Sequence, residues 1–126
     1  LKKNSFISIG REEMGRQNDS EQMGIRGIFV DSKGKLWIAD NGAGIFVYDG
    51  IETINFTEKH NLENEDGNSL HRAFSIAEDS LGNMWFGTVY SGIWRYNPNT
   101  NEFKNFTKQE GVKSENICIL FINIYL

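Results

Sequence analysis

The stretch DSKGKLWIADNGAGIFVY, residues 31–48, occurs a second time as DSLGNMWFGTVYSGIWRY, residues 79–96. Seven of the eighteen aligned positions are identical, whereas unrelated segments of average composition would share about one. The offset is 48 residues throughout, and a fixed period of this size indicates a chain built from copies of one supersecondary unit. The fold therefore follows from what one such unit forms.

Each copy predicts four short antiparallel strands joined by Gly-containing turns. The strands are expected at residues 25–31, 35–40, 44–48 and 51–57 in the first copy, and at 73–79, 83–88, 92–96 and 102–107 in the second. The second and third strands carry apolar residues on both faces, so each sheet must be covered on both sides. Identical meanders stacked around an axis meet this requirement, which favours a β-propeller over a β-sandwich; a flat solenoid is the remaining alternative.

The rest of the chain predicts partial units. An N-terminal strand at residues 5–9 and a polar loop fill residues 1–24, and the first repeat then spans 25–72. The second repeat spans 73–115, and residues 116–126 form the first strand of a truncated third repeat. The predicted fold class is thus all-β, with about two full propeller blades and a flanking strand at each end, which is an incomplete propeller.

Composition argues against several classes of function. The net charge is −4 and the basic residues are not clustered, so no nucleic acid partner is expected. No apolar run is long enough to span a bilayer, and this segment is not expected to contact a membrane. Cys118 is the only cysteine, and the two histidines, His60 and His71, lie eleven residues apart in one loop. No metal site and no cofactor are therefore predicted.

The most repeated polar residues predict structure and not catalysis. Asp31 and Asp79 begin equivalent hairpins, where an aspartate side chain accepts hydrogen bonds from backbone N–H groups. The sequons Asn55-Phe56-Thr57 and Asn105-Phe106-Thr107 are explained by strand repetition. No Ser-His-Asp or paired-carboxylate arrangement is evident from the spacing, so no catalytic residue is assigned.

Candidate ligand-binding residues come from the loops in which the copies differ most, since sites on rigid scaffolds lie on variable loops. Asp40-Asn41-Gly42-Ala43 stands opposite Thr88-Val89-Tyr90-Ser91, and these loops should gather with the inter-blade connection on one propeller face. Tyr90 is suited to stacking on a sugar ring, and Asp40 and Asn41 to hydrogen bonding; simple loop variation is the alternative. The candidates are Asp40, Asn41, His71, Arg72, Tyr90 and Ser91.

Residues 76–88, IAEDSLGNMWFGT, followed by GIWRY at 92–96 and an aromatic strand at 103–106, resemble the two-component regulator propeller repeat. The resemblance extends over about residues 25–121. The first copy departs from the pattern, because Val30 stands where Glu78 does and Ala39-Asp40 replace Gly87-Thr88.

This resemblance implies the extracytoplasmic, periplasmic sensor region of a bacterial hybrid two-component regulator. Such a segment would sense an oligosaccharide or another small ligand in signal transduction and would not be an enzyme, since any kinase would lie in another region. Two alternatives remain, and the open ends of the predicted sheet stack suggest the first of them. The chain could be an interaction or self-assembly module that pairs with other blades or copies, or part of a propeller-type lyase.

Overall fold

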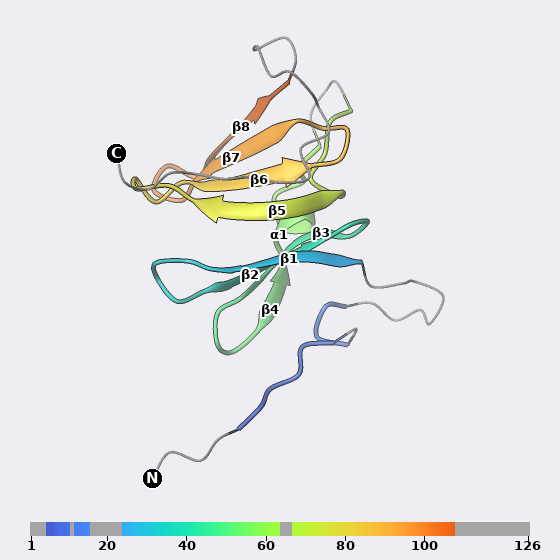
Figure 1. Ribbon diagram of the computed structural model, residues 1–126, viewed down its shortest axis with the longest axis vertical. Coiled ribbons are helices and arrows are strands. Elements are labelled where there is room, and N and C mark those ends of the chain that lie inside the picture. The colour runs from blue at the N-terminus through green and yellow to red at the C-terminus, as the bar shows by residue number, and fades with distance from the viewer. Residues whose placement is uncertain (1–4, 11, 16–23, 64–66, 108–126) are drawn as a thin grey trace.

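The computed structural model describes residues 5–10, 12–15, 24–63 and 67–107. These residues form two four-stranded antiparallel sheets, each with its strands in sequential order (Figure 1). The first sheet contains β1 (Ile25–Val30), β2 (Leu36–Asp40), β3 (Gly44–Tyr48) and β4 (Thr53–Asn55). The second sheet contains β5 (Ala73–Glu78), β6 (Met84–Thr88), β7 (Ile93–Asn97) and β8 (Glu102–Phe106).

The all-β meanders predicted from the repeat are confirmed, and the two four-stranded sheets are consistent with propeller blades. The two sheets do not close a ring among the described residues. The predicted third-repeat strand at 116–126 lies outside the described residues. None of the helices in the described ranges has the length and apolar character of a membrane span.

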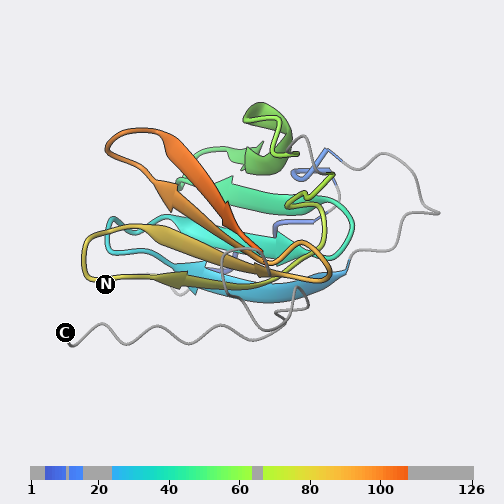
Figure 2. The same ribbon diagram turned by 90° about the horizontal axis from the view of Figure 1, so that it is seen from above.

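The two sheets lie one on the other with their inner strands, β1 and β5, adjacent (Figures 1 and 2). At Gly27 in β1 an added Cβ would lie 2.8 Å from the carbonyl oxygen of Phe74, so the approach of the two strands requires glycine there. The core between the sheets combines alternate residues of both. Its fully or nearly buried strand residues are Trp37, Ala39, Ile45 and Val47 of the first sheet and Ala73, Met84, Phe86 and Trp94 of the second.

An aspartate closes the first hairpin of each sheet and fixes a tryptophan. Oδ1 of Asp31 accepts hydrogen bonds from the backbone N–H groups of Lys33 and Lys35, both at 2.9 Å, and Oδ2 accepts one from Nε1 of Trp37 at 2.8 Å. Asp79 makes the equivalent three bonds 48 residues later, the last one from Trp85 at 2.8 Å. The structural role predicted for both aspartates is confirmed.

The predicted fourth strand of the first copy, 51–57, is wrong at its end. β4 stops at Asn55 and a short helix, α1 (Phe56–Lys59), follows. Oδ1 of Asn55 caps this helix by accepting from the N–H of Glu58 at 3.1 Å. The turn places Phe56 in the core between the sheets, and it brings Oγ1 of Thr57 within 2.9 Å of the backbone nitrogen of Ile45, whose N–H it accepts.

The strand predicted at residues 5–9 is not found, because residues 5–10 have no regular secondary structure. Phe6 and Ile7 are exposed, and only the later part of the N-terminal region, at Ile9 and Met14, lies against the outer face of the first sheet. Met14 and Ile9 pack on Ile38 and Phe46, and they cover part of the face that points away from the second sheet.

Replacement of Asp79 by Asn should destabilise the fold by about 1 to 2 kcal/mol, because an amide nitrogen cannot accept the Trp85 N–H and the site is only partly buried. Burial alone would raise the pKa of Asp79, but the hydrogen bonds from Trp85 and Asn83 outweigh it and hold the pKa below its ordinary value. The carboxylate's contribution is therefore full above the unfolded pKa of about 3.9 and is lost as the pH falls through the folded pKa.

Urea unfolding of wild type and Asp79→Asn at several pH values measures this difference, with Ser80→Ala at the exposed neighbouring position as control. The gap between wild type and Asp79→Asn should narrow as the pH falls below about 4. A gap that stays constant down to acid pH would show that the carboxylate charge contributes nothing.

Gly44→Ala should destabilise the fold by about 2 kcal/mol more than Gly34→Ala. Both glycines have positive φ, +92° and +84°, so the two variants share the conformational strain. A Cβ at Gly44 would lie 2.7 Å from the Cβ of buried Thr57, whereas a Cβ at Gly34 has no heavy atom within 4 Å. Urea unfolding measures both values, and equal destabilisation would contradict the close packing of α1 on β3.

Candidate functional site

The connections between strands lie at the two opposite ends of the strands, which we name the loop edge and the turn edge. The loop edge holds the β2–β3 loop at residues 41–43, the β6–β7 loop at 89–92 and the segment 69–72 that enters β5. The turn edge holds the β1–β2 and β5–β6 turns and the β3–β4 and β7–β8 turns. All six candidate binding residues lie at the loop edge or at the strand end that adjoins it.

Backbone hydrogen bonds tie the segment entering β5 to both loops of the loop edge. Asn41 forms an isolated antiparallel bridge with Arg72, and the N–H of Gly42 donates to the carbonyl of His71 at 2.7 Å. On the other side, the N–H of Val89 donates to the carbonyl of Arg72 at 3.0 Å. The structure therefore brings Asn41, His71 and Arg72 together with the β6–β7 loop, and main-chain bonds set their positions.

Asp40 does not face solvent as the loop hypothesis required. It is 0% exposed, its Oδ1 accepts from the N–H of Ala43 at 3.0 Å, and its Oδ2 accepts from the N–H of Gly24 at 3.0 Å. Thr88, the equivalent residue of the second sheet, is also buried, and its Oγ1 accepts from the N–H of Ser91 at 3.1 Å. The two copies therefore use different side chains, a carboxylate and a hydroxyl, to accept a backbone N–H of the equivalent loop. In the first copy Asp40 stabilises the β2–β3 loop.

Tyr90 is an exposed aromatic residue among the candidates. The residue is 65% exposed, and its backbone φ is +72°, a value that residues other than glycine rarely adopt. The neighbouring Ser91 is engaged, because its Oγ accepts from the N–H of Ser69 at 3.2 Å. Nδ1 of His71 lies 3.1 Å from Oγ of the same Ser69. An exposed aromatic ring thus stands beside a set of fixed polar groups.

A polar hollow of about 700 Å³ adjoins the loop edge on the outer side of the first sheet. Asn41 and His71 line it, whereas Arg72, Tyr90 and Ser91 lie outside its lining. Its other lining residues come from the N-terminal segment, the sheet and the start of α1. They are Glu12, Glu13, Met14, Gly15, Gly42, Ala43, Phe46, Thr53, Asn55 and Glu58.

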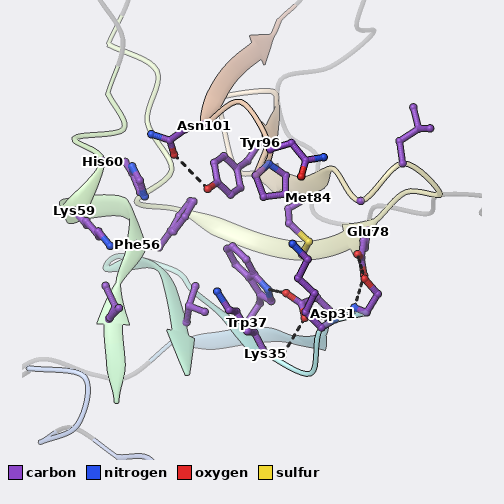
Figure 3. A pocket seen from close by; sticks show the side chains of 18 residues that line it. Asp31, Lys35, Trp37, Phe56, Lys59, His60, Glu78, Met84, Tyr96 and Asn101 are labelled. Atoms are coloured by element: carbon purple, nitrogen blue, oxygen red, sulfur yellow. Dashed lines mark hydrogen bonds between the residues drawn. The ribbon is translucent and has the colours of Figure 1, made fainter. Parts of the chain in front are cut away.

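A second hollow, at the turn edge, was not anticipated from the sequence (Figure 3). This inter-sheet cleft has a volume of about 490 Å³ and opens between the first and second sheets. Trp37, Phe56, Met84 and Tyr96 form much of its apolar wall, and three lysines also line it. One signal for this cleft is present in the sequence, since Lys33 and Lys35 are among the turn residues in which the two copies differ.

An aromatic cluster surrounds His60 at one end of the inter-sheet cleft. The His60 ring centroid lies 4.5 Å from that of Phe56, 5.1 Å from Phe103 and 6.1 Å from Tyr96. Burial, and secondarily the charge of Lys59, hold the pKa of His60 below its ordinary value. The neutral imidazole is therefore favoured in the folded protein, and His60 packs as an aromatic ring.

Within the part of the chain that the structure describes, no three His, Cys, Asp or Glu side chains are placed to hold a metal ion. His60 and His71 belong to opposite edges, the one lining the inter-sheet cleft and the other the polar hollow. The arrangement of the two hollows is suited to holding ligands by hydrogen bonds, ring contacts and charge.

Residues 66–90 match the family model described as the two component regulator propeller. This match confirms the resemblance over the entry to β5, the β5–β6 hairpin and the start of the β6–β7 loop. Comparison with the curated proteins finds no match to this chain.

Proposed function

We propose that this chain is a ligand-binding segment of a two component regulator propeller, and that its loop edge recognises a polyhydroxylated ligand such as an oligosaccharide. The match over residues 66–90 supports the regulator propeller, and the two meander sheets are consistent with its blades. By the same resemblance the segment would act outside the cytoplasm and would sense its ligand without catalysing a reaction.

The observation that carries the ligand proposal is that backbone hydrogen bonds hold the β2–β3 loop, the β6–β7 loop and the segment 69–72 together beside a polar hollow. Asn41 and His71 line the hollow, and the N–H of Gly42, next to Asn41, donates to the carbonyl of His71. Amide and carboxylate groups suit the hydroxyls of a sugar, and Glu12 and Glu58 supply carboxylates in the same lining. Tyr90 adds an exposed ring face at the same edge, on which a sugar ring can stack.

Binding of neutral oligosaccharides tests this proposal. Titration calorimetry with maltohexaose, cellohexaose and xylohexaose should detect at least one ligand of the wild type. Asn41→Ala and Tyr90→Asn should each weaken it by about tenfold, equivalent to about 1.4 kcal/mol. Asn is chosen at position 90 because it tolerates the positive φ while removing the ring.

Leu81→Ala is the matched control, because Leu81 is exposed at the opposite turn edge. This variant should bind the oligosaccharide as the wild type does. The proposal fails if none of the three oligosaccharides binds, or if the loop-edge variants bind as tightly as Leu81→Ala.

We propose as a second function that the outer face of the first sheet docks another blade of the same kind. The repeat defines the two faces. Ile76, Met84, Phe86, Trp94 and Tyr96 form the face of the second sheet that packs on the first. Their counterparts 48 residues earlier are Ile28, Leu36, Ile38, Phe46 and Tyr48, on the outer face of the first sheet.

This outer face is only partly covered. Met14 packs on Ile38 and Phe46, but Ile28 is 70% exposed and Val30 is 61% exposed. Ile76, the counterpart of Ile28, packs against the core between the sheets. A further blade on this face would bury the exposed pair as the first sheet buries Ile76, and a second copy of the chain is the partner that supplies such a blade.

Sedimentation equilibrium of the 126-residue chain tests this docking. The wild type should associate with increasing concentration, and Ile28→Lys should weaken association by about tenfold or more, because a charge in an apolar interface is costly. Ile51→Lys provides the control, since Ile51 is exposed at the β3–β4 turn. A wild type that stays strictly monomeric at high concentration would overturn the proposal.

A further inference from the structure

The inter-sheet cleft differs in chemistry from the polar hollow at the loop edge. One part of its wall is apolar, with Trp37 and Phe56 from the first repeat and Met84 and Tyr96 from the second sheet, and polar and charged side chains line the rest. The Trp37 and Tyr96 ring centroids are 6.5 Å apart across the interface between the sheets. A volume of about 490 Å³ lies within the usual range for small-molecule sites, and these rings suit a flat apolar body.

The carboxylates that line this cleft are already engaged by the protein. Asp31 accepts the N–H groups of its own turn and of the Trp37 ring, as described above. Glu78 accepts from Ser32 twice, from its backbone N–H at 2.7 Å and from its hydroxyl at 2.6 Å. Both carboxylates are therefore held in fixed positions by neutral donors, and the lining carries three lysines against these two acids.

The cations of the cleft are not engaged in this way. Lys33, Lys35 and Lys59 line it from two separate segments, and among the described residues no carboxylate lies within ion-pair distance of their ammonium groups. Backbone hydrogen bonds from Glu52 and Ile51 hold the pKa of Asp49 below its ordinary value, and the charge of Lys35 adds only a small further lowering. The cleft thus combines apolar and aromatic side chains with three lysines that form no ion pair among the described residues and with two carboxylates held by neutral donors.

The walls of the cleft are set before any ligand arrives. The two Ser32–Glu78 hydrogen bonds join the β1–β2 turn of the first sheet to the end of β5 in the second (Figure 3). The bond from Trp37 to Asp31 fixes the indole ring, and Tyr96 donates its hydroxyl hydrogen to Oδ1 of Asn101 at 3.3 Å. A preformed wall lowers the entropic cost of binding.

We propose that the inter-sheet cleft binds an organic anion with a flat apolar body, an aromatic carboxylate. The carboxylate lies among Lys33, Lys35 and Lys59, and the ring packs against Trp37, Met84 and Tyr96. This site is separate from the loop edge and requires a different ligand chemistry. It does not depend on the oligosaccharide proposal.

Isothermal titration calorimetry with naphthalene-2-carboxylate tests the site on the full 126-residue chain. The wild type should bind, and the double variant Lys35→Gln/Lys59→Gln should bind at least about tenfold more weakly. Raising the salt to about 1 M, where the Debye length is about 3 Å, should weaken wild-type binding more than it weakens that of the double variant. Naphthalene-2-carboxamide, which has the same rings without charge, should bind as weakly to the wild type as the acid binds to the double variant.

Lys104→Gln is the matched control, because Lys104 is an exposed lysine of β8 that does not line the cleft. Its affinity for the acid should equal that of the wild type, as should that of Tyr90→Asn, which alters only the loop edge. No binding of the acid, equal binding of acid and amide, or equal effects of the lysine double variant and Lys104→Gln would each overturn the proposal. Because the probe and the variants are different, failure here leaves the oligosaccharide result unaffected.

Discussion

The hydrogen bond from a tryptophan indole to the aspartate that begins the preceding turn is the interaction on which this structure depends. In each sheet one carboxylate joins a tight turn to the largest side chain of the second strand. The orientation of Trp37 then determines its contacts with Phe56 and Phe86, whose ring centroids lie 5.0 and 5.7 Å away. A polar turn residue thereby sets the packing of the apolar core between the sheets.

The repeat predicts the strands well except at the end of the fourth strand of the first copy, where a helix replaces it. Asn55-Phe56-Thr57 and Asn105-Phe106-Thr107 are identical, and both asparagines donate from Nδ2 to the β2–β3 or β6–β7 loop, to Ala43 at 3.5 Å and to Ser91 at 2.8 Å. Strand repetition alone therefore predicted one structure for both. The difference lies one residue further on, because Glu58 completes an Asn-x-x-Glu helix start and lysine occupies the equivalent position of the second copy.

The candidate site was predictable in position and less so in its residues. Loop edges follow from strand order, so the meeting of Asn41 with His71 and Arg72 could be anticipated. The burial of Asp40 could not, because one of its hydrogen-bond donors is Gly24, sixteen residues earlier in a segment without periodicity. The inter-sheet cleft was hidden for a similar reason, since Lys35 and Lys59 come to line one cleft only once α1 follows β4.

The distribution of charge separates the two edges in a way that the net charge of −4 conceals. Glu12, Glu13 and Glu58 line the polar hollow, whereas the inter-sheet cleft carries three lysines and two carboxylates that are already hydrogen-bonded. The lining of the inter-sheet cleft thus carries one more lysine than carboxylates, whereas the lining of the polar hollow holds three carboxylates and neither lysine nor arginine. One pair of sheets therefore presents two hollows whose linings differ in charge, and the difference arises from residues that the repeat does not share.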